Sequence, residues 1–191
     1  MMKSFLYSIL WGISLWFFAS CSQEVKIAIR SEKPSPLVKD YADIIIPSNI
    51  APINFFVEAE DGKEAMVLSF NNHLLSMVCK DGAIIPELNT WKDLLAEAKG
   101  KQIKVEHCIQ TEKGWEAYQA FEIKVAEEDI DPYLAYRLIP PGYEMWNEMG
   151  IYQRNLTNFE ETAILNNTQT DRNCMNCHSF CMQNPEQMQL H

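Results

Sequence analysis

Short runs of apolar residues that alternate with polar ones, or that are dense in β-branched and aromatic side chains, recur through the first two thirds of the chain. This pattern is typical of β-strands, because successive side chains of a strand point to opposite faces of a sheet. We expect strands over residues 43–46, 53–59, 65–70, 73–79, 103–109 and 121–125. Turn-forming pairs separate the early strands: Asp61-Gly62, Asn71-Asn72 and Asp81-Gly82. These pairs predict an antiparallel meander with a tight hairpin at Asp61-Gly62.

One stretch follows the period of an amphipathic helix instead. Its apolar residues share one helical face: Trp91, Leu94, Leu95 and Ala98. Thr90 is expected to cap the helix, with Asp93 three residues on, and Gly100 ends the pattern. The fold class that follows is α+β, mostly β, with an antiparallel sheet and one covering helix over residues 40–126.

The character of the chain changes from Glu127 onward. Prolines interrupt the periodic pattern and aromatic residues become dense, so we expect residues 127–191 to form an irregular, aromatic-rich segment. The acidic residues Glu127, Glu128, Asp129 and Asp131 lack the spacing of an EF-hand. Such a run predicts a solvent-exposed turn rather than a calcium site or a pair of catalytic carboxylates.

An almost unbroken apolar run follows Lys3 and extends from Phe5 to Ala19. It is too short and too one-sided in charge for a stable spanning helix, so it predicts an export signal over residues 1–20. Small residues stand directly before Cys21, which is the pattern cleaved in lipoproteins, and Cys21 is therefore the candidate for lipid attachment. The alternatives are an ordinary cleavage site with Cys21 in a disulfide, or an uncleaved anchor.

The polar stretch after this signal, residues 21–39, is broken at Pro34 and Pro36 and predicts a tether. Lipid on Cys21 would hold the folded part at a membrane of the cell envelope, on the periplasmic face or in the outer membrane.

The charge and the glycine content of the chain reduce the classes of partner that we expect. The 191 residues carry 16 basic and 26 acidic side chains, a formal net charge of −10, so nucleic acid is not expected as a partner. The 7 glycines form no phosphate-binding loop motif, which removes support for a nucleotide enzyme.

The chain carries one motif with specific chemistry, Cys174-Met175-Asn176-Cys177-His178. In c-type haem attachment two thiols separated by two residues bond the haem vinyl groups, and the adjacent histidine reaches the iron. The motif predicts one covalent haem c on Cys174 and Cys177, with His178 as the proximal axial ligand. An exported protein suits this chemistry, because covalent haem is attached outside the cytoplasm.

Three other uses of these cysteines stay open. The Cys174/Cys177 pair could be a disulfide or a redox dithiol, although such motifs usually open a helix early in a βαβ unit. A zinc site would add Cys181 and either His178 or His191, but the chain lacks the second paired set of a usual structural site. An iron–sulfur cluster bound by the three cysteines is disfavoured in an oxidising compartment.

The sixth ligand of the haem iron is not fixed by the sequence. Met188 and His191 have enough chain to reach around the haem, whereas Met182 is too close to His178 to leave the proximal side. His107 shares a strand face with apolar residues and is expected to be a core histidine, and His73, at a hairpin edge, is expected to face solvent.

The remaining thiols are ambiguous. Cys79 and Cys108 lie in predicted strands and either pair across the sheet or stay as buried free thiols. Cys181, beside the haem motif, is either a reactive thiol or a buried one.

Four strings together resemble one known group: residues 49–55 (NIAPINF), 130–139 (IDPYLAYRLI), 152–159 (YQRNLTNF) and 173–180 (NCMNCHSF). The chain resembles the N-terminal region of uncharacterised secreted bacterial lipoproteins that carry a cytochrome c-type motif ahead of a TolB-like, WD40-like β-propeller. The resemblance covers most of residues 40–191. In that group the chain continues into the propeller, and no repeat of blade length follows here, so we expect a truncated reading frame or a product without the larger domain.

These observations lead to two hypotheses. The first is a lipid-anchored c-type haem protein that transfers electrons to an unidentified redox partner or senses redox state, with the β-rich part as scaffold or docking surface. The second is a haem-free binding lipoprotein in which the motif cysteines form a structural disulfide. An electron-transfer or binding protein is expected rather than a catalyst such as a peroxidase, because no acid/base constellation accompanies the motif.

Overall fold

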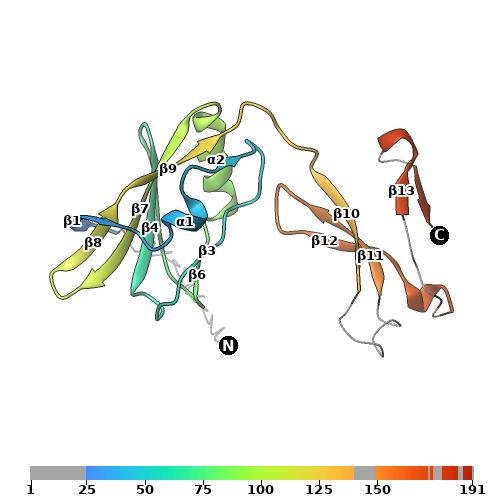
Figure 1. Ribbon diagram of the computed structural model, residues 1–191, viewed down its shortest axis with the longest axis horizontal. Coiled ribbons are helices and arrows are strands. Elements are labelled where there is room, and N and C mark those ends of the chain that lie inside the picture. Colours follow the sequence, from blue (N-terminus) through green and yellow to red (C-terminus); the bar gives the residue numbers. More distant parts are fainter. Residues whose placement is uncertain (1–24, 140–148, 172, 174–177, 185–186, 191) are drawn as a thin grey trace, which may run out of the picture.

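A computed structural model gives the architecture of the chain and describes residues 25–139, 149–171, 173, 178–184 and 187–190. A β-rich unit with a single long helix comes first, and a three-stranded sheet and a two-stranded ribbon follow it (Figure 1). The expected α+β, mostly β class is confirmed. Within the first unit, two short strands, β3 (Phe55–Phe56) and β6 (Ala83–Ile84), pair with each other. The remaining strands of this unit form one main sheet.

Seven strands make up the main sheet: β1 (Ile27–Pro34), β2 (Ile45–Ile46), β4 (Glu64–Phe70), β5 (His73–Val78), β7 (Gln102–Thr111), β8 (Gly114–Gln119) and β9 (Phe121–Val125). The long strand β7 pairs with β9 along its first half and with β8 along its second half. The register shifts by one residue between Val105↔Phe121 and Cys108↔Ala117, which is a β-bulge between β8 and β9. The sheet is mixed, because β1 pairs parallel to β8 and β2 parallel to β9.

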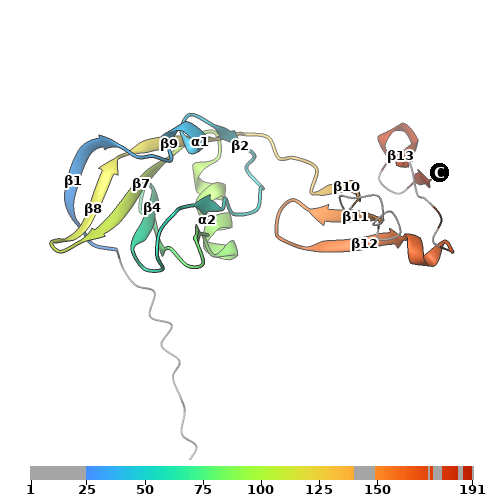
Figure 2. The same cartoon turned by 60° about the horizontal axis from the view of Figure 1, so that its bottom comes forward.

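The predicted helix is α2 (Leu88–Ala98), and it covers one face of the main sheet (Figure 2). Its buried residues are the predicted stripe: Trp91, Leu94, Leu95 and Ala98. They pack in one apolar core with inward-facing sheet residues such as Met66, Leu68, Ile103 and Val105. The expected Thr90 cap is wrong. Glu87 caps the helix, since its carboxylate accepts the backbone N–H groups of Asn89 and Thr90 at 3.0 and 2.9 Å.

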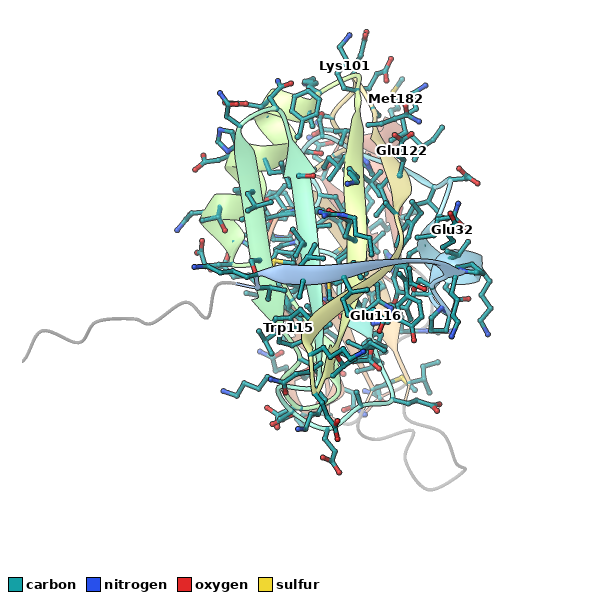
Figure 3. All side chains as sticks on the ribbon, turned by 90° about the vertical axis from the view of Figure 1, so that its left-hand side faces the viewer. Glu32, Lys101, Trp115, Glu116, Glu122 and Met182 are labelled. Carbon is teal, nitrogen blue, oxygen red and sulfur yellow. The ribbon has the colours of Figure 1, made fainter. Side chains whose placement is uncertain are left out.

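The predicted tether over residues 21–39 is also wrong where the structure describes it. Residues 27–34 form β1, whose Ile27 and Ile29 face inward while Ala28 and Arg30 are exposed. The N–H of Val25 donates to Ser76 Oγ of β5 at 3.0 Å, so the chain crosses the sheet face from the β8 edge to β5 (Figure 3). Val25 and Ile27 thereby bury a second apolar cluster against Val67, Cys108 and Trp115.

The turn predictions had mixed outcomes. Asn71-Asn72 does join a hairpin, with Phe70 opposite His73 in the β4–β5 pair. Asp61-Gly62 does not, because the strand before it, β3, pairs with β6 rather than with β4. Asp81-Gly82 forms a two-residue turn in which both residues have positive φ (53° and 72°), as a type I′ hairpin turn requires.

The part of the segment after residue 127 that the structure describes is not irregular. β10 (Tyr133–Leu138), β11 (Gly150–Asn155) and β12 (Glu161–Asn166) form a three-stranded antiparallel sheet, followed by the short 3₁₀ turn η2 (Asn167–Gln169). Tyr136 and Tyr152 lie opposite each other in this sheet and their rings stack with centroids 6.0 Å apart. This cross-strand pair stabilises the sheet.

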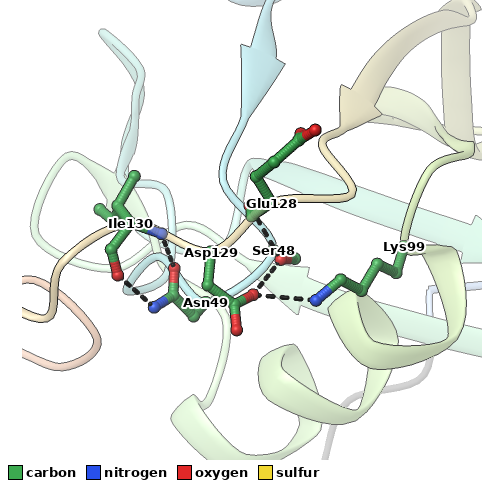
Figure 4. A network of polar contacts seen from close by, with 6 residues as sticks. All are labelled: Ser48, Asn49, Lys99, Glu128, Asp129 and Ile130. Atoms are coloured by element: carbon green, nitrogen blue, oxygen red, sulfur yellow. Dashed lines mark hydrogen bonds and ion pairs between the residues drawn. The ribbon is translucent and has the colours of Figure 1, made fainter.

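Hydrogen bonds and an ion pair hold residues 128–130, which connect the main sheet to the β10–β11–β12 sheet (Figure 4). Asn49 bonds the backbone of Ile130 twice, donating to its carbonyl at 2.9 Å and accepting its N–H at 3.0 Å. Asp129 accepts from Ser48 Oγ and pairs with Lys99 Nζ at 3.0 Å. These contacts lower the pKa of Asp129, chiefly through the Ser48 and Lys99 hydrogen bonds. The acidic residues 127–129 are exposed, which confirms the predicted surface turn.

Candidate functional site

The predicted haem motif ends in a two-stranded ribbon. Its histidine, His178, is the first residue of β13 (His178–Phe180), which pairs antiparallel with β14 (Met188–Leu190). Cys174 and Cys177 lie outside the described residues, as do Cys21, the candidate for lipid attachment, and His191, a candidate sixth ligand. The described part of the site therefore consists of His178 and the ribbon that carries it.

A tight turn closes the ribbon. The 3₁₀ turn η3 (Cys181–Gln183) begins it, and the Cys181 N–H donates to the Gln187 carbonyl at 2.9 Å. Asn184 N–H donates to the Cys181 carbonyl at 2.8 Å. Within the turn Met182 has a φ of 49°, and its side chain is 96% exposed. These backbone bonds fix which residues of β13 and β14 lie opposite each other.

The surroundings of His178 suit an iron ligand. Its half-buried imidazole meets the ring of Phe180 edge to face, with centroids 6.4 Å apart and an interplanar angle of 84°. Within the described part of the chain we find no hydrogen bond or ion pair on this imidazole. A ring nitrogen with no polar partner among the described residues is available to bind a metal, and the aromatic neighbour restricts rotation of the ring.

The ribbon brings a second candidate ligand close to His178. Met188, a candidate sixth ligand, lies opposite Phe180 in the register, and His178 lies opposite Leu190. His178 and Met188 are thus diagonal neighbours on two paired strands, a position in which side chains share a face of the ribbon.

The other two described histidines are engaged elsewhere. His107 is buried, with Nε2 2.8 Å from Glu64 Oε2 and Nδ1 2.9 Å from Ser35 Oγ. Burial lowers the pKa of His107, and this effect exceeds the opposing influence of Glu64. The predicted core role of His107 is confirmed. His73 is partly exposed, as expected, and its Nε2 lies 2.8 Å from Glu97 Oε1 of α2.

The structure also decides the state of three cysteines. Cys79 and Cys108 are buried free thiols in two different clusters, Cys79 in the core beneath α2 and Cys108 in the cluster beneath β1. The sheet separates them, so a bridge between them is excluded by the fold. Burial raises the pKa of Cys108 to about 12. Cys181 is free and exposed at the turn of the ribbon.

Two buried polar arrangements were not predicted from the sequence. The first is the Ser35–His107–Glu64 chain of hydrogen bonds described above. In the second, the buried carboxylate of Glu106 pairs with Arg30 Nε at 3.0 Å and Lys104 Nζ at 3.1 Å. The available signal was the period of two set by Val25, Ile27 and Ile29, because it marks the strand that carries Arg30 and leads to Ser35.

Two hollows on the described surface have no lining residue from the ribbon. These adjoining hollows, of about 470 and 450 Å³, share Lys104, Gln119 and Ala120 at the β8–β9 bulge. Acidic and basic side chains mix along them, and Glu32 and Glu122 point outward from the sheet (Figure 3). None of these residues belongs to the haem motif.

Among the described residues, no group of three or more histidine, cysteine or acidic side chains is placed to hold a metal ion. A search of the same residues for a helix long and apolar enough to cross a membrane also finds none. The predicted zinc alternative depends on Cys174 and Cys177, so it falls outside the described part of the chain.

Comparison with protein-family models, curated proteins and solved structures finds no match to this chain.

Proposed function

We propose that this protein is a lipid-anchored c-type haem protein of the cell envelope that transfers electrons or senses redox state. The observation that carries the proposal is the Cys174-Met175-Asn176-Cys177-His178 motif, whose histidine has no polar partner in the described part of the chain. Cys174 and Cys177 would bond the haem, and His178 would bind its iron.

The donor set fits this group. When bound, haem supplies an iron centre that cycles between ferric and ferrous states, with a potential set by its axial ligands and its burial. The half-buried His178 imidazole provides a nitrogen ligand, and Phe180 provides an apolar neighbour beside it. These are the residue types that hold and tune a haem in other proteins.

The rest of the chain supports an anchored scaffold for such a group. The apolar run before Cys21 predicts export and lipid attachment, which would bring the protein to a membrane that its acidic surface does not attract. The β-rich unit has a packed core of its own and would serve as scaffold or docking surface for a redox partner protein. A net charge of −10 favours a basic partner surface over nucleic acid.

The test is haem staining and intact mass of the full chain exported in cells that contain cytochrome c maturation machinery. The expected result is one covalent haem that survives denaturation and is lost in Cys174→Ala/Cys177→Ala. Cys181→Ala is the matched control, because this exposed thiol lies three residues beyond the motif and should leave haem attachment unchanged.

A different outcome would contradict the proposal. A disulfide would be identified by a haem-free chain whose mass is two hydrogens below that of its reduced form. This mass difference would be absent from Cys174→Ala/Cys177→Ala. The second hypothesis, a haem-free binding lipoprotein, would then hold.

A further inference from the structure

The register of the β13–β14 ribbon decides which of its residues share a face. In an antiparallel pair, directly opposite residues share a face, and so do residues two positions apart on one strand. Phe180 lies opposite Met188, and His178 lies two residues before Phe180. His178, Phe180 and Met188 therefore project from the same face. The ring contact between His178 and Phe180, with centroids 6.4 Å apart, agrees with a shared face for these two residues of β13.

Axial ligands of a haem iron approach from opposite sides of the porphyrin. Two side chains on one face of a ribbon could do this only if the porphyrin stood edge-on between them. A porphyrin edge extends further from the iron than either side chain extends from the ribbon, so the backbone of the ribbon would block it. Ligation by both His178 and Met188 would thus require the strands to separate and the Cys181–Gln187 backbone bond of 2.9 Å to break.

We infer that the ribbon is a one-sided platform: His178 is its single axial ligand, Phe180 is a positioning residue that sets the rotation of the imidazole, and Met188 is an apolar neighbour on the same side rather than the sixth ligand. This inference rests on the proposed haem function. Phe180 would act on the His178 imidazole through their edge-to-face ring contact, which has an interplanar angle of 84°. Any sixth ligand would then come from outside the ribbon face.

The experiment uses the full chain carrying covalent haem, with loading of each variant checked by intact mass. Methionine ligation of ferric haem gives a weak absorption band in the red, which is lost when the methionine is replaced. Met188→Leu is expected to leave the red region of the spectrum unchanged. Met182→Leu is the matched control, because Met182 lies on the same ribbon with its side chain exposed.

A band that is present in the wild type, retained in Met182→Leu and lost in Met188→Leu would overturn the assignment of Met188. Absence of the band from the wild type supports the assignment, as does a band that persists in Met188→Leu. If Met188→Leu does not take up haem, Met188→Ile provides the same comparison.

Phe180→Leu tests the positioning role. Because imidazole rotation changes the magnetic axes of ferric haem, this variant is expected to shift the electron paramagnetic resonance signal and the reduction potential while haem loading stays complete. An unchanged signal and potential would overturn the role of Phe180. A wild-type chain without covalent haem would instead contradict the proposed function, and this inference with it. Intact mass therefore distinguishes failure of the proposed function from failure of the ligand assignment.

Discussion

His107 Nε2 lies 2.8 Å from Glu64 Oε2, and the two residues are diagonal neighbours on β7 and β4. A carboxylate only accepts hydrogen bonds, so Nε2 carries the proton and Nδ1 accepts the hydroxyl proton of Ser35. The Ser35 oxygen accepts the N–H of Leu37 in turn, at 3.1 Å. A neutral His107 therefore satisfies every partner around it and ties the end of β1 to the centre of the sheet.

His107→Leu should lower the free energy of unfolding by about 1–3 kcal/mol, because it removes the donor to the Glu64 carboxylate and the acceptor of the Ser35 hydroxyl proton. Urea unfolding measures the change. His73→Leu is the control and should cost less than about 1 kcal/mol, since its pair with Glu97 is at the surface. Equal effects of the two substitutions would show that the buried network contributes nothing beyond a surface pair.

The same histidine predicts a pH dependence. Burial lowers the pKa of folded His107 below its ordinary value of 6.5, so the unfolded chain binds this proton first as the pH falls. The contribution of His107 to stability is therefore complete above pH 6.5 and decreases as the pH falls from 6.5 towards the lower pKa of the folded state. Unfolding free energies measured across this range should fall less steeply in His107→Leu than in the wild type. Parallel slopes would contradict the prediction.

Thiol reactivity should separate the cysteines of the folded chain. Cys181 is exposed and should be alkylated first, whereas Cys79 and Cys108 are buried. A pKa of about 12 gives Cys108 a thiolate fraction roughly a thousandfold below that of an ordinary thiol. Peptide mapping by mass spectrometry after a short exposure to iodoacetamide tests this order. In denaturant all three should react, and labelling of native Cys108 as fast as Cys181 would refute the buried placement.

The helix cap offers a direct comparison between the sequence-based and the observed assignment. Glu87→Ala removes the acceptor of two backbone N–H groups, whereas Thr90→Ala removes only a hydroxyl that donates to the Glu87 carbonyl at 3.1 Å. Thermal unfolding should show a larger loss for Glu87→Ala. The same hydrogen bonds lower the pKa of Glu87 below 4.5, so the cap is complete above pH 4.5 and is lost as the pH falls through the lowered value. A larger effect of Thr90→Ala would favour the original expectation.

Asn49→Ala should loosen the connection between the two sheets. It removes both hydrogen bonds to the Ile130 backbone, at a cost of about 1–3 kcal/mol. Hydrogen exchange at residues 128–131 is expected to accelerate. Asn158→Ala is the matched control, because within the described part of the chain the side-chain amide of Asn158 bonds only to Glu160, in its own turn. Unchanged exchange in Asn49→Ala would show that other contacts hold the connection.

The sequence alone was enough for features that depend on neighbours along the chain. The spacing of Trp91, Leu94 and Leu95 determined the buried face of α2, since helical periodicity is local. Asn71-Asn72 determined the β4–β5 hairpin for a similar reason. The spacing of Cys174, Cys177 and His178 likewise defined the haem hypothesis without any tertiary information.

Only the tertiary structure decided which residues far apart in the sequence contact each other. The parallel pairing of β1 with β8, the placement of Cys79 and Cys108 in separate clusters, and the contact of His107 with Ser35 all join segments whose separation along the chain carries no local signal. The shared face of His178 and Met188 depends on strand register, and a shift of one residue would place them on opposite faces. Local patterns set which elements form, whereas packing of the whole chain sets which of them meet.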